Sequence, residues 1–181
     1  MALPSTVYRL DIAVQDTERG VYEDLSLRVA QHPSETERFL VTRLLAYCLS
    51  YEPELAFTKG LSTTDEPAIW SKDPTGTITL WIDVGQPSVE RLHRASKLAE
   101  RVEVYTHRDP ELLRKEAEKQ RVHKGESIKV VAFDPAFLDR IAAKLERSSK
   151  WDVLRTEGHV YVTLGGETID APIVETTLVD A

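Results

Sequence analysis

Apolar and polar residues alternate along two stretches near the start of this chain, residues 8–14 and 21–29. Alternation with a period of two is typical of a half-buried β-strand, because successive side chains point to opposite faces. The segment between them, 16–20, reads DTERG and contains turn-forming residues. The pattern therefore predicts an N-terminal β-hairpin.

A helical pattern follows the hairpin. Ser34 and Glu37 have the S-x-x-E spacing of a capping box, which predicts a helix that begins at Glu35. Its apolar face is expected to consist of Leu40, Leu44, Tyr47, Cys48 and Tyr51, and Pro53 is expected to end it. Arg43 either pairs with one of the acidic groups or lies on the surface.

The stretch 77–84 alternates most cleanly and predicts a strand whose last residues include Asp83. Asp83 is not expected to be buried among the aliphatic side chains. Ser88 is the predicted N-cap of a helix over 88–101, and Asp65 lies in an acidic turn before the strand. Two carboxylates near a helix N-terminus are typical of a cation or phosphate site. The alternative is that both are ordinary turn and strand-end residues.

The rest of the chain continues with strands and helices. A strand is predicted at 102–105 and a buried strand at 128–133, and Asp109-Pro110 and Asp134-Pro135 are each predicted to start a helix. Turns at Glu157-Gly158 and Gly165-Gly166 predict a C-terminal meander. We therefore expect one α/β (α+β) domain spanning 1–181, with a central mixed β-sheet flanked by helices and with hairpins at both ends.

Composition narrows the classes of function. The 181 residues include 23 Lys and Arg against 30 Asp and Glu, and the net charge of −7 argues against a simple nucleic-acid coat protein. It does not exclude a nuclease, whose metal-binding carboxylates add negative charge.

Cys48 is the single cysteine, which suits a reducing cytoplasm. No signal peptide is recognised, and no apolar run approaches membrane-spanning length. The histidines lack the spacing of a zinc site.

Several strings along nearly the whole chain resemble the YaeQ family of bacterial proteins. They are HPSET at 32–36, RLLA at 43–46, Phe57 with Gly60-Leu61, DEP at 65–67 with Trp70, WIDVGQP at 81–87 and the Glu157-Gly158 hairpin. The resemblance implies a variant of the restriction-endonuclease-like PD-(D/E)XK nuclease fold. It also implies a candidate active site.

In that fold, carboxylates hold Mg²⁺, which polarises the scissile phosphate and activates water. The resemblance assigns the metal-binding positions to Glu35, Asp65 and Asp83, with Glu66 as an alternative to Asp65. The lysine of the nuclease motif should fall at position 85, where this chain has Gly85.

Three residues are candidates to replace this lysine as the catalytic cation or hydrogen-bond donor. Gln86 could take the place if the chain bulges at Gly85, and Arg94 or Lys97 could reach it from the following helix. Arg94 could stabilise phosphate charge, but it could not act as a base at neutral pH.

Two functions follow. One is a Mg²⁺-dependent phosphodiesterase acting on nucleic acid, with the acidic trio as metal ligands. The other is a nuclease-like module that no longer cleaves and serves binding or regulation. The acidic trio favours the first function, whereas Gly85 and the negative net charge favour the second.

Overall fold

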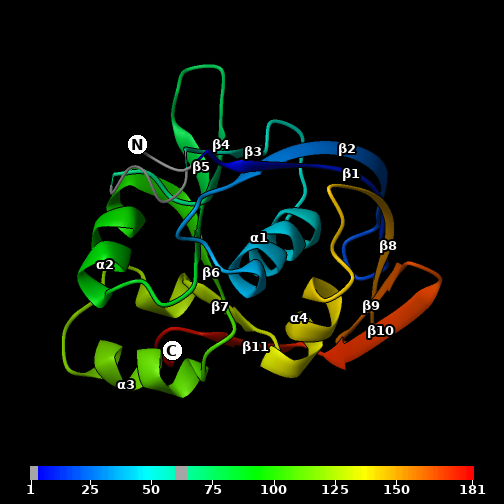
Figure 1. Cartoon of the computed structure of the whole chain (residues 1–181). Coiled ribbons are helices and arrows are strands. Elements are labelled where there is room, and N and C mark those ends of the chain that lie inside the picture. The colour runs from blue at the N-terminus through cyan, green and yellow to red at the C-terminus, as the bar shows by residue number, and fades with distance from the viewer. Residues whose placement is uncertain (1–3, 60–64) are drawn as a thin grey trace. The chain divides into compact units, whose positions relative to one another are not determined.

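The computed structural model describes residues 4–59 and 65–181, and the chain divides into two compact units (Figure 1). The first unit takes Met1–Tyr51 and Asp134–Ile173, and the second takes Glu52–Phe133 and Val174–Ala181. Each unit contains one mixed β-sheet. The mixed α+β class expected from the sequence is confirmed, with the strands divided between two mixed sheets. The expectation of a single domain stays a prediction.

The first unit is built on a five-stranded sheet with the order β10-β9-β8-β1-β2. The strands are β1 (Thr6–Asp16), β2 (Val21–Gln31), β8 (Ser148–Thr156), β9 (His159–Leu164) and β10 (Glu167–Pro172). β1 and β8 run parallel, and the other neighbours are antiparallel. The predicted N-terminal hairpin and C-terminal meander are both confirmed, and the parallel β1–β8 pair joins them in one sheet.

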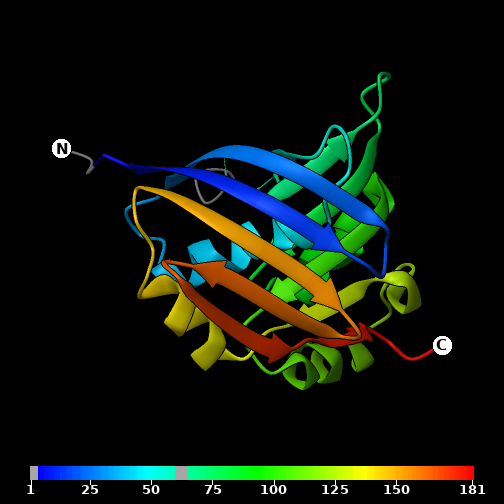
Figure 2. The same cartoon turned by 90° about the vertical axis from the view of Figure 1, so that its right-hand side faces the viewer.

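Two helices, α1 (Glu37–Leu49) and α4 (Pro135–Ala142), lie on the same side of this sheet (Figure 2). α4 contacts α1 and β10. The alternating residues of β1 give this side its apolar surface, since Leu10, Ile12 and Val14 are each only 1% exposed. Cys48 of α1 is buried as expected, and burial raises the pKa of its thiol to about 12, which keeps it uncharged and inert.

The start of α1 differs from the capping-box prediction. Thr36 is the N-cap, and its hydroxyl accepts a 3.1 Å hydrogen bond from the Phe39 amide. Ser34 instead bonds the ring of His32, at 2.7 Å between Oγ and Nδ1. Glu35 therefore precedes the helix rather than opening it. The prediction was wrong because two hydroxyl residues stand two positions apart, and either satisfies the local capping rule.

The second unit is built on a six-stranded sheet with the order β11-β7-β6-β5-β4-β3. Its strands are β3 (Ala56–Phe57), β4 (Ile69–Lys72), β5 (Ile78–Val84), β6 (Ala99–Thr106), β7 (Lys129–Ala132) and β11 (Val174–Thr177). β5, β6 and β7 run parallel, and the flanking pairs are antiparallel. The apolar run at 128–133 contains the buried β7, as predicted.

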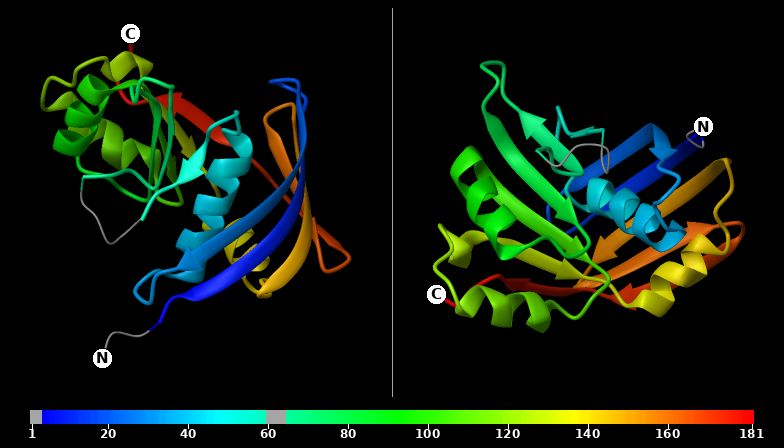
Figure 3. Two further views of the ribbon diagram at one scale, coloured as in Figure 1. Left: turned by 90° about the horizontal axis from the view of Figure 1, so that it is seen from above. Right: turned by 60° about the vertical axis from the view of Figure 1, so that its left-hand side comes forward.

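Helices α2 (Val89–Leu98) and α3 (Pro110–Glu118) pack against β6 and β7 respectively (Figure 3), and a short 3-10 helix, η2, spans Gly125–Ser127. The predicted N-caps Ser88, Asp109 and Asp134 are confirmed, because each side chain accepts from a first-turn amide. α2 ends earlier than predicted, since Ala99 already pairs with Ile78 and starts β6. The candidate site lies at the turn from β5 to α2 within this parallel β5–α2–β6 unit.

Candidate functional site

The segment that joins β5 to α2 turns sharply at Gly85. Its φ of 97° lies in a region that glycine adopts readily and that other residues adopt with strain. Its amide donates a 2.9 Å hydrogen bond to the Tyr105 carbonyl of β6. Ser88 then caps α2 by accepting from the Arg91 amide at 3.2 Å. The glycine at the position of the expected lysine is therefore explained by backbone conformation.

Asp83, near the end of β5, is bound by Arg91 from the first turn of α2. The guanidinium donates from Nε to Oδ2 and from NH2 to Oδ1, both at 2.9 Å. Side-chain exposure is 4% for Asp83 and 24% for Arg91. The expectation that Asp83 would not be buried was wrong. β5 lies between two other strands of the sheet. The strand pattern alone predicts a solvent-exposed carboxylate at the strand end, but Arg91 covers it.

Arg91 also connects Asp83 with the acidic turn. Its NH2 group donates to the Glu66 carbonyl at 2.7 Å, and its Cζ lies 5.5 Å from the centroid of the Trp81 ring. The Ala68 amide donates to the Ile82 carbonyl at 3.1 Å. The structure thus brings the segment of Asp65 and Glu66 beside the end of β5, with Asp65 exposed at a bend.

Glu35, in the first unit, is held in a similar way by Arg43 of α1. Nε donates to Oε2 at 3.0 Å and NH2 to Oε1 at 2.9 Å, and NH2 also donates to the Ala30 carbonyl at 2.9 Å. Side-chain exposure is 2% for Glu35 and 6% for Arg43. Of the two alternatives for Arg43, pairing with an acidic group is the one observed. Burial raises the pKa of Glu35, and the nearby charge of Arg43 offsets part of that effect.

The predicted donor residues lie on the surface of the second unit. Gln86 is exposed directly after Gly85, and Arg94 and Lys97 are exposed on α2. Arg91, which the sequence analysis did not single out, is the α2 arginine that contacts Asp83. The sequence contains a signal for this contact. Arg91 is three positions after the N-cap Ser88, so it lies in the first turn of the helix, close to the strand that precedes it.

Both oxygens of Asp83 and both oxygens of Glu35 accept hydrogen bonds from an arginine. Among residues 4–59 and 65–181, no group of three or more His, Cys, Asp or Glu side chains is arranged to hold a metal ion. The indole N–H of Trp81 is buried and has no hydrogen-bond partner within the same described part of the chain. As arranged here, each of the two buried carboxylates is bound by a guanidinium.

Comparison with known proteins is consistent with this fold. A family model for the YaeQ protein matches residues 1–173. The chain belongs to the YaeQ family. It is similar to the YaeQ protein of Pseudomonas syringae, whose crystal structure has a TM-score of 0.87 and 34% identity, covering 98% of this chain and 97% of that one.

A second YaeQ crystal structure, from Xanthomonas axonopodis pv. citri, has a TM-score of 0.87 and 31% identity, covering 98% of this chain and 99% of that one. The uncharacterized YaeQ protein of Escherichia coli (strain K12) is 38% identical over 107 residues, 59% of this chain and 59% of that protein. The matched segment thus spans less than two thirds of this relative. No helix in the described part of this YaeQ-family chain is long and apolar enough to cross a membrane.

Proposed function

We propose that this chain is a nuclease-like module that binds nucleic acid without cleaving it. The observation that carries the proposal is the bidentate pair between Asp83 and Arg91, with both contacts at 2.9 Å. A carboxylate whose charge is already neutralised by a guanidinium has little electrostatic reason to recruit a divalent cation. Removing Arg91 from Asp83 would also leave a buried charge without its partner, which is costly.

Three further observations support the proposal. Glu35 is neutralised by Arg43 in the same manner, so two of the three predicted metal ligands already have a cationic partner. Gly85 has a φ of 97°, which glycine adopts readily and a lysine would adopt only with strain. Backbone conformation therefore accounts for the absence of the strand-end lysine of the nuclease motif. Gln86, Arg94 and Lys97 are exposed in and beside α2, where they are available to contact phosphates.

The binding role is tested by fluorescence anisotropy at several salt concentrations, with short labelled single-stranded DNA, duplex DNA and RNA. We expect saturable binding, with Arg94→Gln and Lys97→Gln each weakening it and each reducing the salt slope by about one. Arg121→Gln, an exposed arginine in the segment after α3, is the charge-matched control. The binding role is wrong if none of the three nucleic acids binds saturably, or if the control weakens binding equally.

A Mg²⁺-dependent phosphodiesterase is the second candidate, and one observation favours it. The main chain of Glu66 and the carboxylate of Asp83 both accept from Arg91, so the acidic turn lies beside the strand end as such a site requires. In that function Glu35, Asp65 and Asp83 would hold the ion, and Gln86, Arg94 or Lys97 would supply the donor. Arg91 would have to leave Asp83 first.

Cleavage assays with Mg²⁺ and Mn²⁺, run beside melting curves at increasing metal concentration, separate the two candidates. A binding module gives neither cleavage nor a metal-dependent rise in melting temperature beyond that of Asp83→Asn. A phosphodiesterase gives both, because an ion that binds the folded state stabilises it. In that case Asp83→Asn removes both effects.

A further inference from the structure

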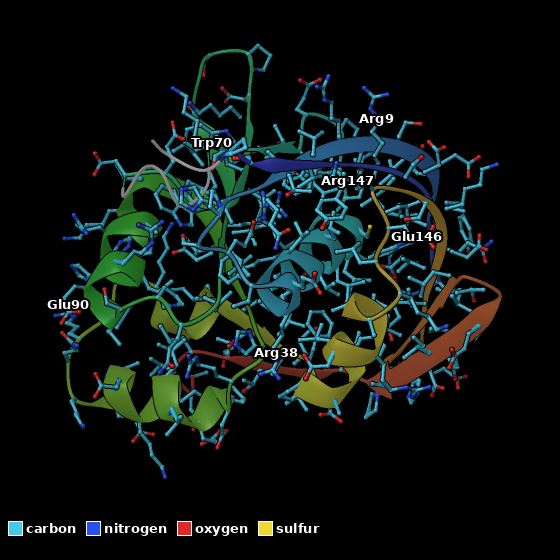
Figure 4. The ribbon with its side chains drawn as sticks, viewed as in Figure 1. Arg9, Arg38, Trp70, Glu90, Glu146 and Arg147 are labelled. Atoms are coloured by element: carbon cyan, nitrogen blue, oxygen red, sulfur yellow. The ribbon has the colours of Figure 1, made fainter. Side chains whose placement is uncertain are left out.

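The face of the first sheet opposite α1 and α4 carries two arginines directly across from each other. Arg9 of β1 and Arg28 of β2 are register partners in the antiparallel pair, and Ser148 of β8 is the partner of Arg9 on its other side. Arg9 extends from β1 away from α1 (Figure 4). Side chains of directly opposite residues lie about 4.5–5.5 Å apart at Cβ, so the two positive charges repel each other.

Eight of the other twelve arginines in residues 4–59 and 65–181 are bound to carboxylates, whereas Arg94, Arg108, Arg121 and Arg147 are not. Arginines in both units form ion pairs with carboxylates: Arg19, Arg38, Arg43, Arg91, Arg101, Arg114, Arg140 and Arg155. Within residues 4–59 and 65–181, the side chains of Arg9 and Arg28 form no such pair. Asp11, two residues after Arg9 on β1, accepts a 2.8 Å hydrogen bond from the Ser26 hydroxyl and forms no ion pair with either arginine. Two facing guanidinium groups are therefore left to an anion from outside the chain.

The two arginines line a hollow in the surface. It has a volume of about 390 Å³, and Ser26, Ser148 and Asp11 contribute to its wall. Each guanidinium can donate two parallel hydrogen bonds to a phosphate, and a serine hydroxyl can donate a further one. This combination of fixed planar donors is the usual reason for arginine at phosphate sites.

A second hollow of about 420 Å³ continues along the same strands and shares Asp11 and Ser26 with the first. Its charged residues are Asp11, Asp24, Asp152 and one cation, Lys150. Asp24 of β2 and Asp152 of β8 both pair in register with Ala13. The small Ala13 side chain between them leaves room above the sheet for a ligand. Carboxylates accept hydrogen bonds and donate none, so this end suits a group rich in hydroxyls.

We propose that this face binds a small phosphate ester of a polyhydroxylated molecule, in other words a sugar phosphate. The phosphate lies between Arg9 and Arg28, and the hydroxyls of the sugar donate to Asp24 and Asp152. Each hollow, at about 390 or 420 Å³, has a volume within the range of small ligand sites in proteins. All of these residues belong to the first unit and none belongs to the site of Asp83, so this inference does not depend on the proposed nucleic-acid function.

Titration of the full chain with glucose 6-phosphate, inorganic phosphate and glucose, followed by amide NMR shifts and calorimetry in 0.15 M salt, tests the proposal. We expect glucose 6-phosphate to bind most tightly, with shifts centred on residues 9–11, 24–28 and 148–152. Arg28→Gln and Arg9→Gln should each weaken its binding about tenfold or more, as expected for a lost charge-assisted contact. Arg121→Gln, with the same change in charge, should bind like the parent.

Asp152→Asn separates the two ends of the site. It should weaken binding of glucose 6-phosphate and leave inorganic phosphate unaffected or bound more tightly. The proposal is overturned if neither phosphate compound binds saturably, or if Arg121→Gln weakens binding as much as Arg28→Gln. It is also overturned if Asp152→Asn leaves glucose 6-phosphate binding unchanged. Melting curves confirm that each variant is folded, and either arginine variant alone suffices for the test.

Discussion

Asp83 receives two hydrogen bonds from Arg91, which follows it by eight residues across the turn from β5 to α2. Glu35 receives two from Arg43, which also follows it by eight residues. In both pairs the same guanidinium also donates to a backbone carbonyl, that of Glu66 or of Ala30. The two carboxylates expected to hold a cation from solution are thus already bound to a cation from the chain.

Loss of Arg91 should destabilise the second unit. Arg91→Met leaves the Asp83 carboxylate buried without its partner, which should lower the free energy of unfolding by about 2–3 kcal/mol, less than for a fully buried pair because Arg91 is 24% exposed. Arg94→Met, on the exposed side of the same helix, should change it by less than about 0.5 kcal/mol. Urea unfolding measures both. Equal effects of the two variants would contradict the importance of the pair.

Gly85 should be intolerant of a side chain. Gly85→Ala forces a residue with a Cβ to adopt a φ of 97°, and should cost about 1–3 kcal/mol of stability. Gln86→Ala, at the exposed neighbouring position, should stay within about 0.5 kcal/mol of the parent. Thermal and urea unfolding compare the two. If Gly85→Ala is as stable as the parent, the backbone explanation for the absent lysine is wrong.

Glu35 should give the first unit a measurable pH dependence. Burial raises its pKa in the folded chain above the unfolded value, so the folded state binds more protons in the window between the two values. Stability contributed by this group is therefore present below the unfolded pKa and is lost as pH rises through the folded pKa. The stability of the parent minus that of Glu35→Gln should fall as pH rises from 4.5 through that window.

Urea unfolding of both proteins at closely spaced pH values gives this difference directly. A difference that rises with pH would mean that Arg43 lowers the pKa of Glu35 more than burial raises it, contrary to the expectation. Glu167, whose pKa is lowered by Lys144, affects parent and variant alike and cancels in the subtraction.

The start of α1 offers a comparison between two hydroxyl residues, Ser34 and Thr36, that stand two positions apart. Thr36→Ala removes the acceptor for the Phe39 amide and should cost about 0.5–2 kcal/mol. Ser34→Ala removes an exposed contact to His32 and should cost less than about 0.5 kcal/mol. Equilibrium unfolding of the two variants ranks them, and the reverse ranking would restore the helix start that the capping box predicted.

The facing arginines should reduce stability in the absence of a ligand. Arg28→Gln relieves the repulsion between Arg28 and Arg9, so the ligand-free protein should gain about 0.2–1 kcal/mol. The gain should shrink as salt rises, because exposed charges are screened. Melting curves in dialysed, phosphate-free buffer at two ionic strengths measure it. A loss of stability would indicate that Arg28 has a structural role instead.

The features that could be predicted from the sequence are those determined locally. The alternation in β1 and β5, the N-caps Ser88 and Asp109, and the turn at Glu157-Gly158 depend on neighbouring residues. The parallel pairing of β1 with β8 joins segments far apart in the chain and has no local signal. The division of the strands between two sheets follows from such distant pairings.

The candidate site shows the same limit. Asp83 could be placed at a strand end beside a helix N-terminus, because its neighbours in the chain determine that position. Its burial could not be predicted, since it depends on Arg91 reaching back across the turn at Gly85 and on the acidic turn joining the same guanidinium. Whether Arg43 pairs with an acidic group or lies exposed could not be predicted for the same reason. Its partner, Glu35, precedes the helix that carries Arg43.

The discontinuous make-up of the two units sets an order of assembly during synthesis. The β1–β2 hairpin leaves the ribosome first, but the β1 edge that pairs with β8 stays open until residues 148–156 have been made. The parallel core of the second unit, β5 to β7, is complete well before that point. The last segment, with β11 and the buried Leu178, then returns to the second unit. A chain cut short at its C-terminus therefore loses part of the unit that was synthesised in the middle.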